Sequence, residues 1–247
     1  MFKNILVISD NLMLCEAFEN LIHKLEYEGA IWTFAVSPYS DEQNFRKSLK
    51  ISVMSYDLKN PLHIKEIAKK HDLVFSIHCK QLFPSSLVNT VKCINIHPGY
   101  NPINRGWYPQ VFAIINNLPT GATIHEINNQ LDHGAIIARD FIEKDITDSS
   151  KTLYDKIIKK EIELLEEHLL NILENTYDTI QPENEGHLFY KKDFNELCEL
   201  DLNENMTALE FINRLRALTH EPYNNAYFRD PSDNKKVYIG LQLKKEE

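Results

Sequence analysis

Cysteines, basic residues and long apolar runs are all scarce in this sequence of 247 residues. The four cysteines, at positions 15, 79, 93 and 198, form no C-x-x-C pair, so we expect neither a metal site nor a disulfide framework. Free thiols and the lack of a recognisable targeting segment favour a cytoplasmic protein. No stretch approaches the roughly 18 apolar residues of a membrane-spanning helix, so we expect no membrane partner.

The charge balance argues against a nucleic-acid partner. The chain has 27 basic and 36 acidic residues and a formal net charge of -9. Proteins that bind nucleic acid generally gather Lys and Arg on one face to meet the phosphates, and this composition does not favour such a face. Hydrophobic residues make up 43% of the chain, which is enough for a substantial buried core.

The first half of the sequence alternates short apolar runs with segments of helical periodicity. Strands are expected over 2–8, 31–36, 73–77 and 93–97, and a shorter one over 51–55. Between them, apolar residues recur at helical spacing from Leu14 to Leu25, and Pro61 marks a second helix start. This order predicts an α/β fold with a mostly parallel, Rossmann-like sheet flanked by helices.

The second half continues the sheet and then changes in character. We expect a helix over 111–118, strands over 122–127 and 135–142, and a long helix from 149 to about 172. The polar segment 181–186 suggests a boundary, which divides the chain into a catalytic domain (1–180) and a small C-terminal element (181–247). That element should contain a helix from Thr207, with a capping box to Glu210, and a hairpin formed by 226–228 and 237–243.

Three polar residues suggest a catalytic site. Asn95 and His97 lie two apart in a predicted strand, so their side chains project from the same face, at the carboxyl end where open α/β sheets bind ligands. Asp132 lies in a turn between two later strands. Individually, His97 could be a structural histidine and Asp132 an ordinary turn residue. Together they supply a hydrogen-bond donor, a base and an orienting carboxylate.

The sequence around these residues resembles the folate-dependent formyltransferases. That family has an Asn-x-His strand followed by a loop with Pro and Gly, here Pro102 and Gly106, and a later Leu-Asp-x-Gly segment, here 131–134. The resemblance covers residues 73–175 well. Segments 78–84 and 97–110 resemble the subgroup that acts on dTDP-4-amino-4,6-dideoxyglucose, and 216–228 resembles a tail common to sugar N-formyltransferases.

The resemblance implies transfer of a formyl group from 10-formyltetrahydrofolate, without a metal, to an amine on a nucleotide-linked sugar. It makes Asn95 the donor to the oxyanion, His97 the general base or a second donor, and Asp132 the group that orients His97. It also implies which residues bind the folate and which bind the nucleotide sugar. The folate set is Gln81, Phe83, Leu131 and Gly134, and the sugar set is Lys80, Arg105, Trp107, Tyr223, Asn224 and Tyr227.

Several of these binding roles have plain structural alternatives. Phe83 is equally suited to the core, Lys80 and Arg105 to the solvated surface, and the aromatic group near Tyr223 and Tyr227 to packing of the C-terminal element. A 3-amino sugar, a formyltetrahydrofolate hydrolase or a folate- or nucleotide-binding regulator without turnover are the alternative functions. The resemblance further implies a role in O-antigen synthesis, and the terminal hairpin suggests a homodimer.

Overall fold

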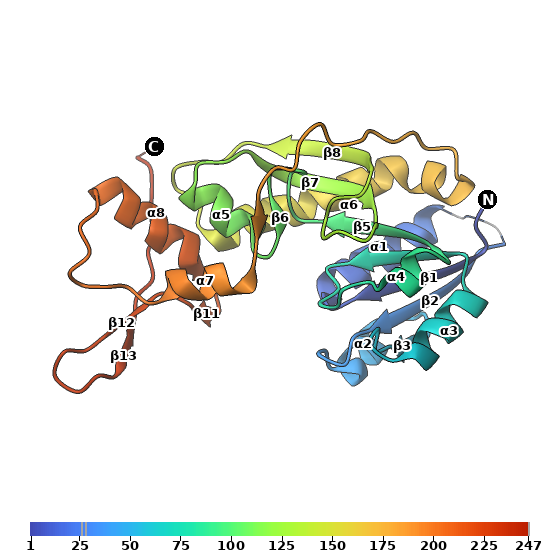
Figure 1. The fold of residues 1–247 in the computed structure, drawn as a ribbon, viewed down its shortest axis with the longest axis horizontal. Coiled ribbons are helices and arrows are strands. Elements are labelled where there is room, and N and C mark those ends of the chain that lie inside the picture. The colour runs from blue at the N-terminus through green and yellow to red at the C-terminus, as the bar shows by residue number, and fades with distance from the viewer. Residues whose placement is uncertain (26, 28, 247) are drawn as a thin grey trace.

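A twisted sheet of seven strands forms the centre of the computed structural model, which describes residues 1–25, 27 and 29–246 (Figure 1). The strand order is β3-β2-β1-β4-β5-β7-β8. The strands up to β5 pair in parallel, whereas β7 and β8 are antiparallel. Their bounds are β1 (Asn4–Ser9), β2 (Ile31–Val36), β3 (Val53–Ser55), β4 (Leu73–Ile77), β5 (Lys92–His97), β7 (Thr120–Glu126) and β8 (Ile136–Ile142).

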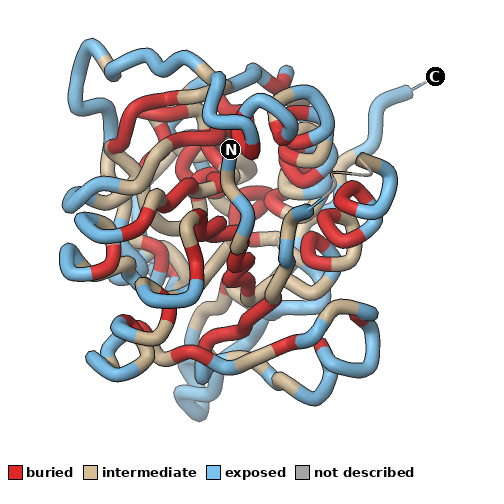
Figure 2. Tube along the Cα trace, turned by 90° about the vertical axis from the view of Figure 1, so that its right-hand side faces the viewer, coloured by how far each residue is buried: buried red, intermediate tan, exposed pale blue. Residues whose placement is uncertain are grey.

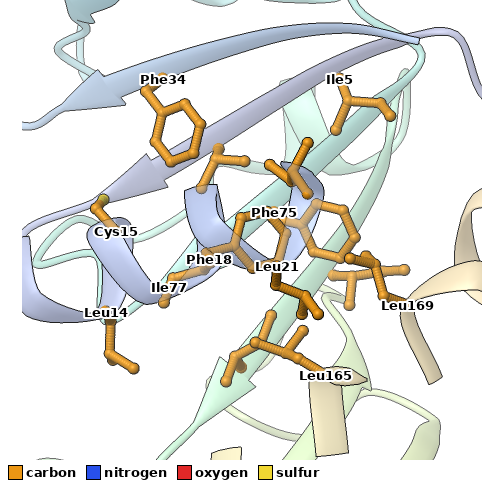
Figure 3. Close-up of a cluster of buried hydrophobic side chains, with 14 of the residues drawn as sticks. Ile5, Leu14, Cys15, Phe18, Leu21, Phe34, Phe75, Ile77, Leu165 and Leu169 are labelled. Carbon is orange, nitrogen blue, oxygen red and sulfur yellow. The ribbon is translucent and has the colours of Figure 1, made fainter. Parts of the chain in front are cut away.

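Helices cover both faces of the sheet, and the strand sequences show why. Successive residues of a strand point to opposite faces, and in β1 both faces are apolar. Ile5 and Val7 pack with α1 (Leu12–Leu25) and α6 (Ser150–Glu174), while Leu6 and Ile8 pack with α3 (Pro61–Lys70) and α4 (Ser85–Val88). Figure 3 shows side chains of the first cluster, and Figure 2 shows the buried backbone concentrated inside the molecule.

The C-terminal segment shares a core with the sheet domain. A third apolar cluster joins Phe112 and Leu153 to Phe194, Leu215 and others. Its helices are α5 (Pro109–Ile115), α7 (Lys191–Cys198) and α8 (Ala208–Leu218). Three small two-stranded sheets complete this region: β6 (Arg105–Gly106) with β9 (Leu188–Phe189), β10 (Thr219–His220) with β11 (Tyr223–Asn224), and β12 (Tyr227–Arg229) with β13 (Lys236–Tyr238).

Most of the predicted elements are confirmed, with some shifted ends. The capping box of Thr207 and Glu210 is present, and the terminal hairpin forms, although its second strand stops at Tyr238 instead of continuing to 243. The predicted helix 111–118 begins at Pro109 and ends at Ile115. The short helices α2 (Glu42–Ser48), α4 and α7 were not predicted, because each buries a single side chain and therefore has no apolar periodicity.

No helix in the described ranges is long and apolar enough to cross a membrane.

Candidate active site

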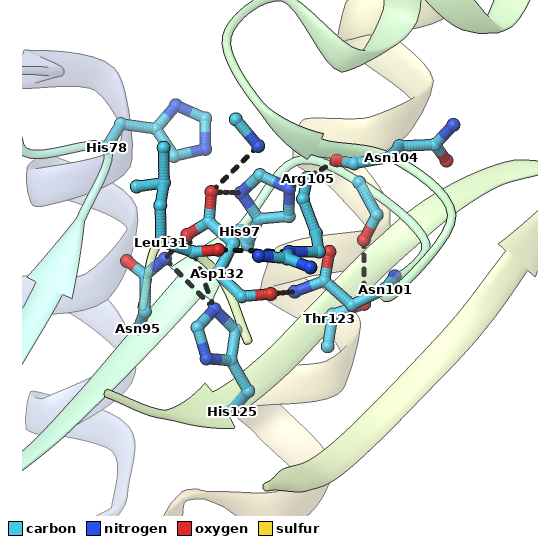
Figure 4. Close-up of polar contacts among 12 residues, drawn as sticks. His78, Asn95, His97, Asn101, Asn104, Arg105, Thr123, His125, Leu131 and Asp132 are labelled. Carbon is cyan, nitrogen blue, oxygen red and sulfur yellow. Dashed lines mark hydrogen bonds and ion pairs between the residues drawn. The ribbon is translucent and has the colours of Figure 1, made fainter. Parts of the chain in front are cut away.

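The three predicted catalytic side chains lie together at one edge of the sheet (Figure 4). Asn95 and His97 project from β5 as the period-two spacing requires. The antiparallel neighbour β7 places His125 directly opposite Asn95, and Thr123 opposite His97. The turn 127–135 between β7 and β8 then brings Asp132 over the same edge, so the site is built from β5, β7 and one turn.

Asn95 uses both hydrogens of its side-chain amide within the site. Its Nδ2 lies 3.1 Å from Asp132 Oδ1 and 3.2 Å from His125 Nε2. The other ring nitrogen of His125 lies 2.7 Å from the backbone oxygen of Glu126. Since a carbonyl oxygen can only accept, His125 carries its proton on Nδ1, and Nε2 accepts from Asn95. The orientation of the amide is therefore fixed by two acceptors.

Asp132 is a nearly buried carboxylate, with 10% of its side chain exposed. Its backbone has a φ of +46°, and its Oδ2 accepts the backbone N–H of Gly106 at 3.0 Å. Burial alone would raise the pKa of Asp132, but the imidazoles of His97 and His125 and the Gly106 N–H outweigh it and hold the pKa well below its usual range. Asp132 is therefore ionised at neutral pH.

His97 is held by a backbone carbonyl rather than by Asp132. Its Nε2 donates to the oxygen of Asn104 at 2.7 Å, while Nδ1 lies 3.6 Å from Asp132 Oδ2, which is beyond hydrogen-bond range. The prediction that Asp132 orients this ring thus needs correction, because Asp132 acts on it through charge. Burial lowers the pKa of His97, and the negative charge of Asp132 partly opposes that effect. Gly99 permits the arrangement, since a Cβ there would lie 2.6 Å from His97 Nε2.

Arg105 holds the turn that carries Asp132. The surface position considered for Arg105 is wrong, because the residue is 5% exposed. Its guanidinium donates to the backbone oxygen of Leu131 at 3.0 Å and to both the backbone and side-chain oxygens of Glu185. Asn101 adds a second tie through its side-chain amide, which donates to the backbone oxygen of Asp132. Contact of Arg105 with a substrate remains a prediction.

The predicted folate-binding residues flank this turn or lie in the loop after β4. The side-chain amide of Gln81 is bonded to the backbone of Tyr56 and Leu58, so it stabilises the loop. Phe83 is half-buried and packs against the apolar cluster beneath α3 and α4. Leu131 is half-buried. Gly134 lies so close to β7 that an added Cβ would overlap the backbone oxygen of Glu126.

The predicted sugar-binding residues fall into separate places. Lys80 is exposed, with its backbone N–H bonded to Asp10. Trp107 lines an open hollow together with the side chains of segment 190–192. Tyr223 and Asn224 are exposed in β11, whereas Tyr227 belongs to the hairpin, where it bonds Glu199 and contacts Tyr238. The expected aromatic group is therefore divided between two small sheets.

Sequence reasoning missed two contributors to the site, His125 and Asn104, and it named Gly106 only as the glycine of the family's loop. His125 was visible as a polar residue in a predicted strand, but its partner depends on the register between β5 and β7. Asn104 and Gly106 act through backbone groups, for which the residue type gives no signal. Among the described residues, no set of three His, Cys, Asp or Glu side chains is arranged to hold a metal ion. The arrangement offers a fixed amide, a neutral buried imidazole and a carboxylate, which suits acyl transfer.

Comparison with known proteins agrees with this chemistry. Residues 52–169 match the family model described as "Formyl transferase", and residues 193–245 match "N-formyltransferase dimerization C-terminal domain". A dTDP-4-amino-4,6-dideoxyglucose formyltransferase of Mycobacterium bovis is 49% identical over 183 residues, which cover 74% of this chain and 78% of that protein.

Solved structures resemble the chain along nearly its whole length. A 4-N formyltransferase from Francisella tularensis superposes with a TM-score of 0.92 at 41% identity, covering 99% of both chains. A sugar N-formyltransferase from a Shewanella species gives a TM-score of 0.94 at 37% identity, again covering 99% of both chains.

Proposed function

Because the chain belongs to the folate-dependent sugar N-formyltransferase family, we propose that it moves the formyl group of 10-formyltetrahydrofolate onto the 4-amino group of dTDP-4-amino-4,6-dideoxyglucose. The observation that carries the reaction type is the cluster of Asn95, His97 and Asp132 at the sheet edge. The choice of acceptor rests on the 49% identity with the mycobacterial enzyme. Formylated sugars of this kind would serve the synthesis of a surface polysaccharide such as O-antigen.

Asn95 is the proposed donor to the oxyanion. When the amine attacks the formyl carbon, negative charge develops on the formyl oxygen, and an amide N–H already fixed in place stabilises that charge without reorganisation. Asn95 meets the condition of being fixed, since Asp132 and His125 hold its amide. One N–H must leave its partner to reach the oxyanion, and the imidazole nitrogen of His125 is a weaker acceptor than the charged carboxylate of Asp132.

His97 is the proposed group for proton transfer. Its ring is oriented by the Asn104 carbonyl, and its free nitrogen, Nδ1, faces the charged Asp132. Because burial lowers the pKa of His97, the ring is neutral at neutral pH and can accept a proton. When it becomes positively charged, Asp132 stabilises it. It would thus act either as the base for the amine or, once charged, as a donor to the oxyanion or the leaving nitrogen.

The proposed folate site lies between the loop after β4 and the turn that carries Asp132. Phe83 and Ile127 are half-buried side chains packed against one apolar cluster, which leaves apolar surface for a flat ring. Gln81 would support this loop, and the backbone around Leu131 and Gly134 would supply hydrogen bonds. When bound, the folate supplies the activated formyl group.

The proposed nucleotide-sugar site lies on the side of the cluster near the start of α6. There the Tyr223 ring lies 6.0 Å from the His220 ring, which in turn lies 5.5 Å from the ring of Tyr154 on α6. An exposed tyrosine offers a face for stacking on thymine. Asn224, Lys80 and Trp107 are retained as candidates for the sugar and its phosphates, and Tyr227 as a more distant one.

We further propose that residues 1–180 form the catalytic domain and that residues 181–247 join two copies of the chain in a homodimer. The match to a dimerisation domain over residues 193–245 supports this division. Exposed apolar side chains in α8 and the hairpin, including Leu209 and Tyr238, provide surface for such contact. Light scattering after gel filtration should give twice the mass of one chain.

We expect the enzyme in the cytoplasm, in keeping with its four free thiols.

A spectroscopic assay of tetrahydrofolate release tests the proposed reaction. The protein receives 10-formyltetrahydrofolate with the 4-amino dTDP sugar, with the 3-amino isomer, or with no acceptor. We expect release of tetrahydrofolate with the 4-amino sugar, and none with the 3-amino isomer or without an acceptor. Equal or faster release with the 3-amino sugar would reassign the acceptor, and release without any sugar would indicate a hydrolase. Binding of both ligands without release in any arm would mean a non-catalytic protein.

A further inference from the structure

The imidazole of His78 also lies beside His97, and it has no role in the reaction described above. The parallel pairing of β4 with β5 aligns Ile77 with Ile96, so the next residues, His78 and His97, leave the two strands side by side. Figure 4 shows both rings at this edge. His78 has a φ of +51°, a conformation that is uncommon for residues other than glycine. Such local strain persists only where the surrounding structure enforces it, and it is concentrated at functional sites.

His78 is held between two side chains of α6. Its Nε2 lies 2.8 Å from Glu161 Oε1, and its Nδ1 lies 2.9 Å from the hydroxyl oxygen of Tyr154. The Glu161 side chain is completely buried, and its second carboxylate oxygen has no hydrogen-bond partner among the described residues. A carboxylate placed in this way is costly for folding unless it balances a positive charge. A positive charge that forms on the His78 ring during a reaction is one that it can balance.

The hydrogen-bond directions make Nδ1 of His78 the basic atom. The Glu161 carboxylate accepts, so Nε2 carries the proton of the neutral ring. Tyr154 then donates its hydroxyl hydrogen to Nδ1, while the same hydroxyl accepts from Asn11 Nδ2 at 3.1 Å. A tyrosine hydroxyl can donate once and accept twice, so one acceptor position of Tyr154 remains for an incoming N–H. Burial raises the pKa of Tyr154, so the hydroxyl can pass a proton on but does not remain ionised.

Resting on the proposed function, we propose that His78, charge-balanced by Glu161, takes the proton lost by the acceptor amine through the hydroxyl of Tyr154. The amine nitrogen forms its bond to the formyl carbon and gives one hydrogen to Tyr154, whose own hydrogen moves to His78 Nδ1. The bond from the formyl carbon to the folate nitrogen then breaks, and that nitrogen takes a proton that Nδ1 of His97, neutral in the resting enzyme, has first taken up from solvent. Exchange with solvent afterwards removes the proton that His78 has gained.

Replacing His78 by glycine gives a direct test. Glycine adopts a φ of +51° without strain, so His78→Gly should fold and should leave a space the size of an imidazole. We expect kcat to fall by about 100-fold or more, as for loss of a general base, with KM for both substrates changed less than about threefold. Added imidazole should restore kcat at least tenfold. His78→Asn tolerates the same backbone but supplies no base, so imidazole should not restore it.

Two further variants serve as a second test and a control. Glu161→Gln keeps the shape of the side chain but removes the negative charge, so it should also lower kcat while changing KM much less. His71→Asn changes a buried histidine whose one side-chain hydrogen bond among the described residues is with the backbone oxygen of Ile67 in α3, and it should leave kcat unchanged.

The inference is overturned if His78→Gly keeps more than a tenth of kcat, if the loss is confined to KM, or if imidazole fails to restore the folded variant. Each of those results leaves wild-type activity with the 4-amino sugar in place. Failure of the proposed function is recognised separately, because the unaltered enzyme would then release no tetrahydrofolate with that sugar.

Discussion

Replacing Asp132 by asparagine should reduce formyl transfer by about three orders of magnitude while preserving the fold. The carboxylate accepts from Asn95 and from the Gly106 backbone, one bond on each oxygen. Asparagine has the same shape but a single oxygen, so one of these donors would face an NH₂ group. The loss of a hydrogen bond to a charged acceptor costs about 1.5–3 kcal/mol of stability, and because this bond is present in the resting enzyme as well as in the transition state, it changes the rate little.

The larger effect comes from the charge on His97. The Nδ1 of His97 lies 3.6 Å from Asp132 Oδ2, and both side chains are at most 10% exposed. At an effective dielectric constant of about 20, attraction between unit charges at this distance is about 5 kcal/mol. If His97 is charged only in the transition state, nearly all of this stabilisation acts on the barrier, and at about 1.4 kcal/mol per decade it predicts a loss of roughly 1,000-fold in kcat/KM.

The assay is release of tetrahydrofolate in the presence of the amino sugar, measured over a range of pH. Because Asp132 raises the pKa of His97, the pH limb controlled by His97 should move to lower pH in Asp132→Asn. An activity that declines below this pKa would mean that neutral His97 is required, whereas one that declines above it would mean that the charged ring is required. The shift therefore reports the effect of Asp132, and the direction of the limb reports the role of His97.

A control must separate the loss of the Asp132 charge from the general effect of replacing a buried carboxylate. Asp148 is also buried and accepts hydrogen bonds from the Asp145 backbone, Thr152 and Lys156, and among the described residues none of its hydrogen bonds reaches Asn95, His97 or Asp132. Asp148→Asn should therefore leave kcat/KM within about threefold of the unaltered enzyme, whatever its cost in stability. If Asp132→Asn keeps more than a tenth of the activity, the transition state does not contain a charged His97 stabilised by Asp132, and the reasoning fails.

Three further predictions concern stability. Gly106→Ala should destabilise the protein by at least about 1–3 kcal/mol in urea unfolding, because φ is +91° there and a Cβ would lie 2.1 Å from the Phe189 oxygen; an unchanged midpoint would contradict this. Ser149→Ala should cost about 1 kcal/mol by removing the cap that accepts the Thr152 N–H, with kcat unaltered as the check on its distance from the chemistry. The depressed pKa of Asp132 stabilises the fold above about pH 4, the pKa of an unfolded aspartate, and this stabilisation disappears as pH falls toward the folded pKa. Asp132→Asn should therefore flatten that part of the curve of stability against pH, and parallel curves for the two proteins would refute the prediction.

The sequence predicted the parts of the site that follow from local periodicity. Asn95 and His97 project together because they are two apart in a strand whose apolar pattern is clear. The alternation of strands and helices likewise predicted a mostly parallel sheet, since buried parallel strands read as continuous apolar runs. Asp132 could be grouped with them only as a polar residue in a turn between two later strands, with support from the family resemblance, because it lies 35 positions after His97 in the chain.

The remaining contacts depend on tertiary structure that no local pattern encodes. His125 meets Asn95 through the register of two antiparallel strands. Arg105 is buried because Glu185, which is 80 residues away, reaches it. His78 and Glu161 are separated by 83 residues, and only the packing of α6 against the sheet brings them together. Side chains with charges are expected at the surface, so sequence reasoning places them there unless a partner is known.

The pairing of these distant groups gives the site a property that neither pair has alone. Asp132 faces His97 and Glu161 contacts His78, so each of the two neighbouring imidazoles at the ends of β4 and β5 has a carboxylate beside it. Formyl transfer removes a proton from the acceptor nitrogen and adds one to the donor nitrogen, so its net proton change is zero. Once His97 has taken up its proton, one imidazole gains a proton as the other loses one, so the net charge of the four side chains stays constant during formyl transfer. In a buried site, where an uncompensated charge is costly, that constancy favours two separate histidines over a single histidine whose charge would change between the two proton transfers.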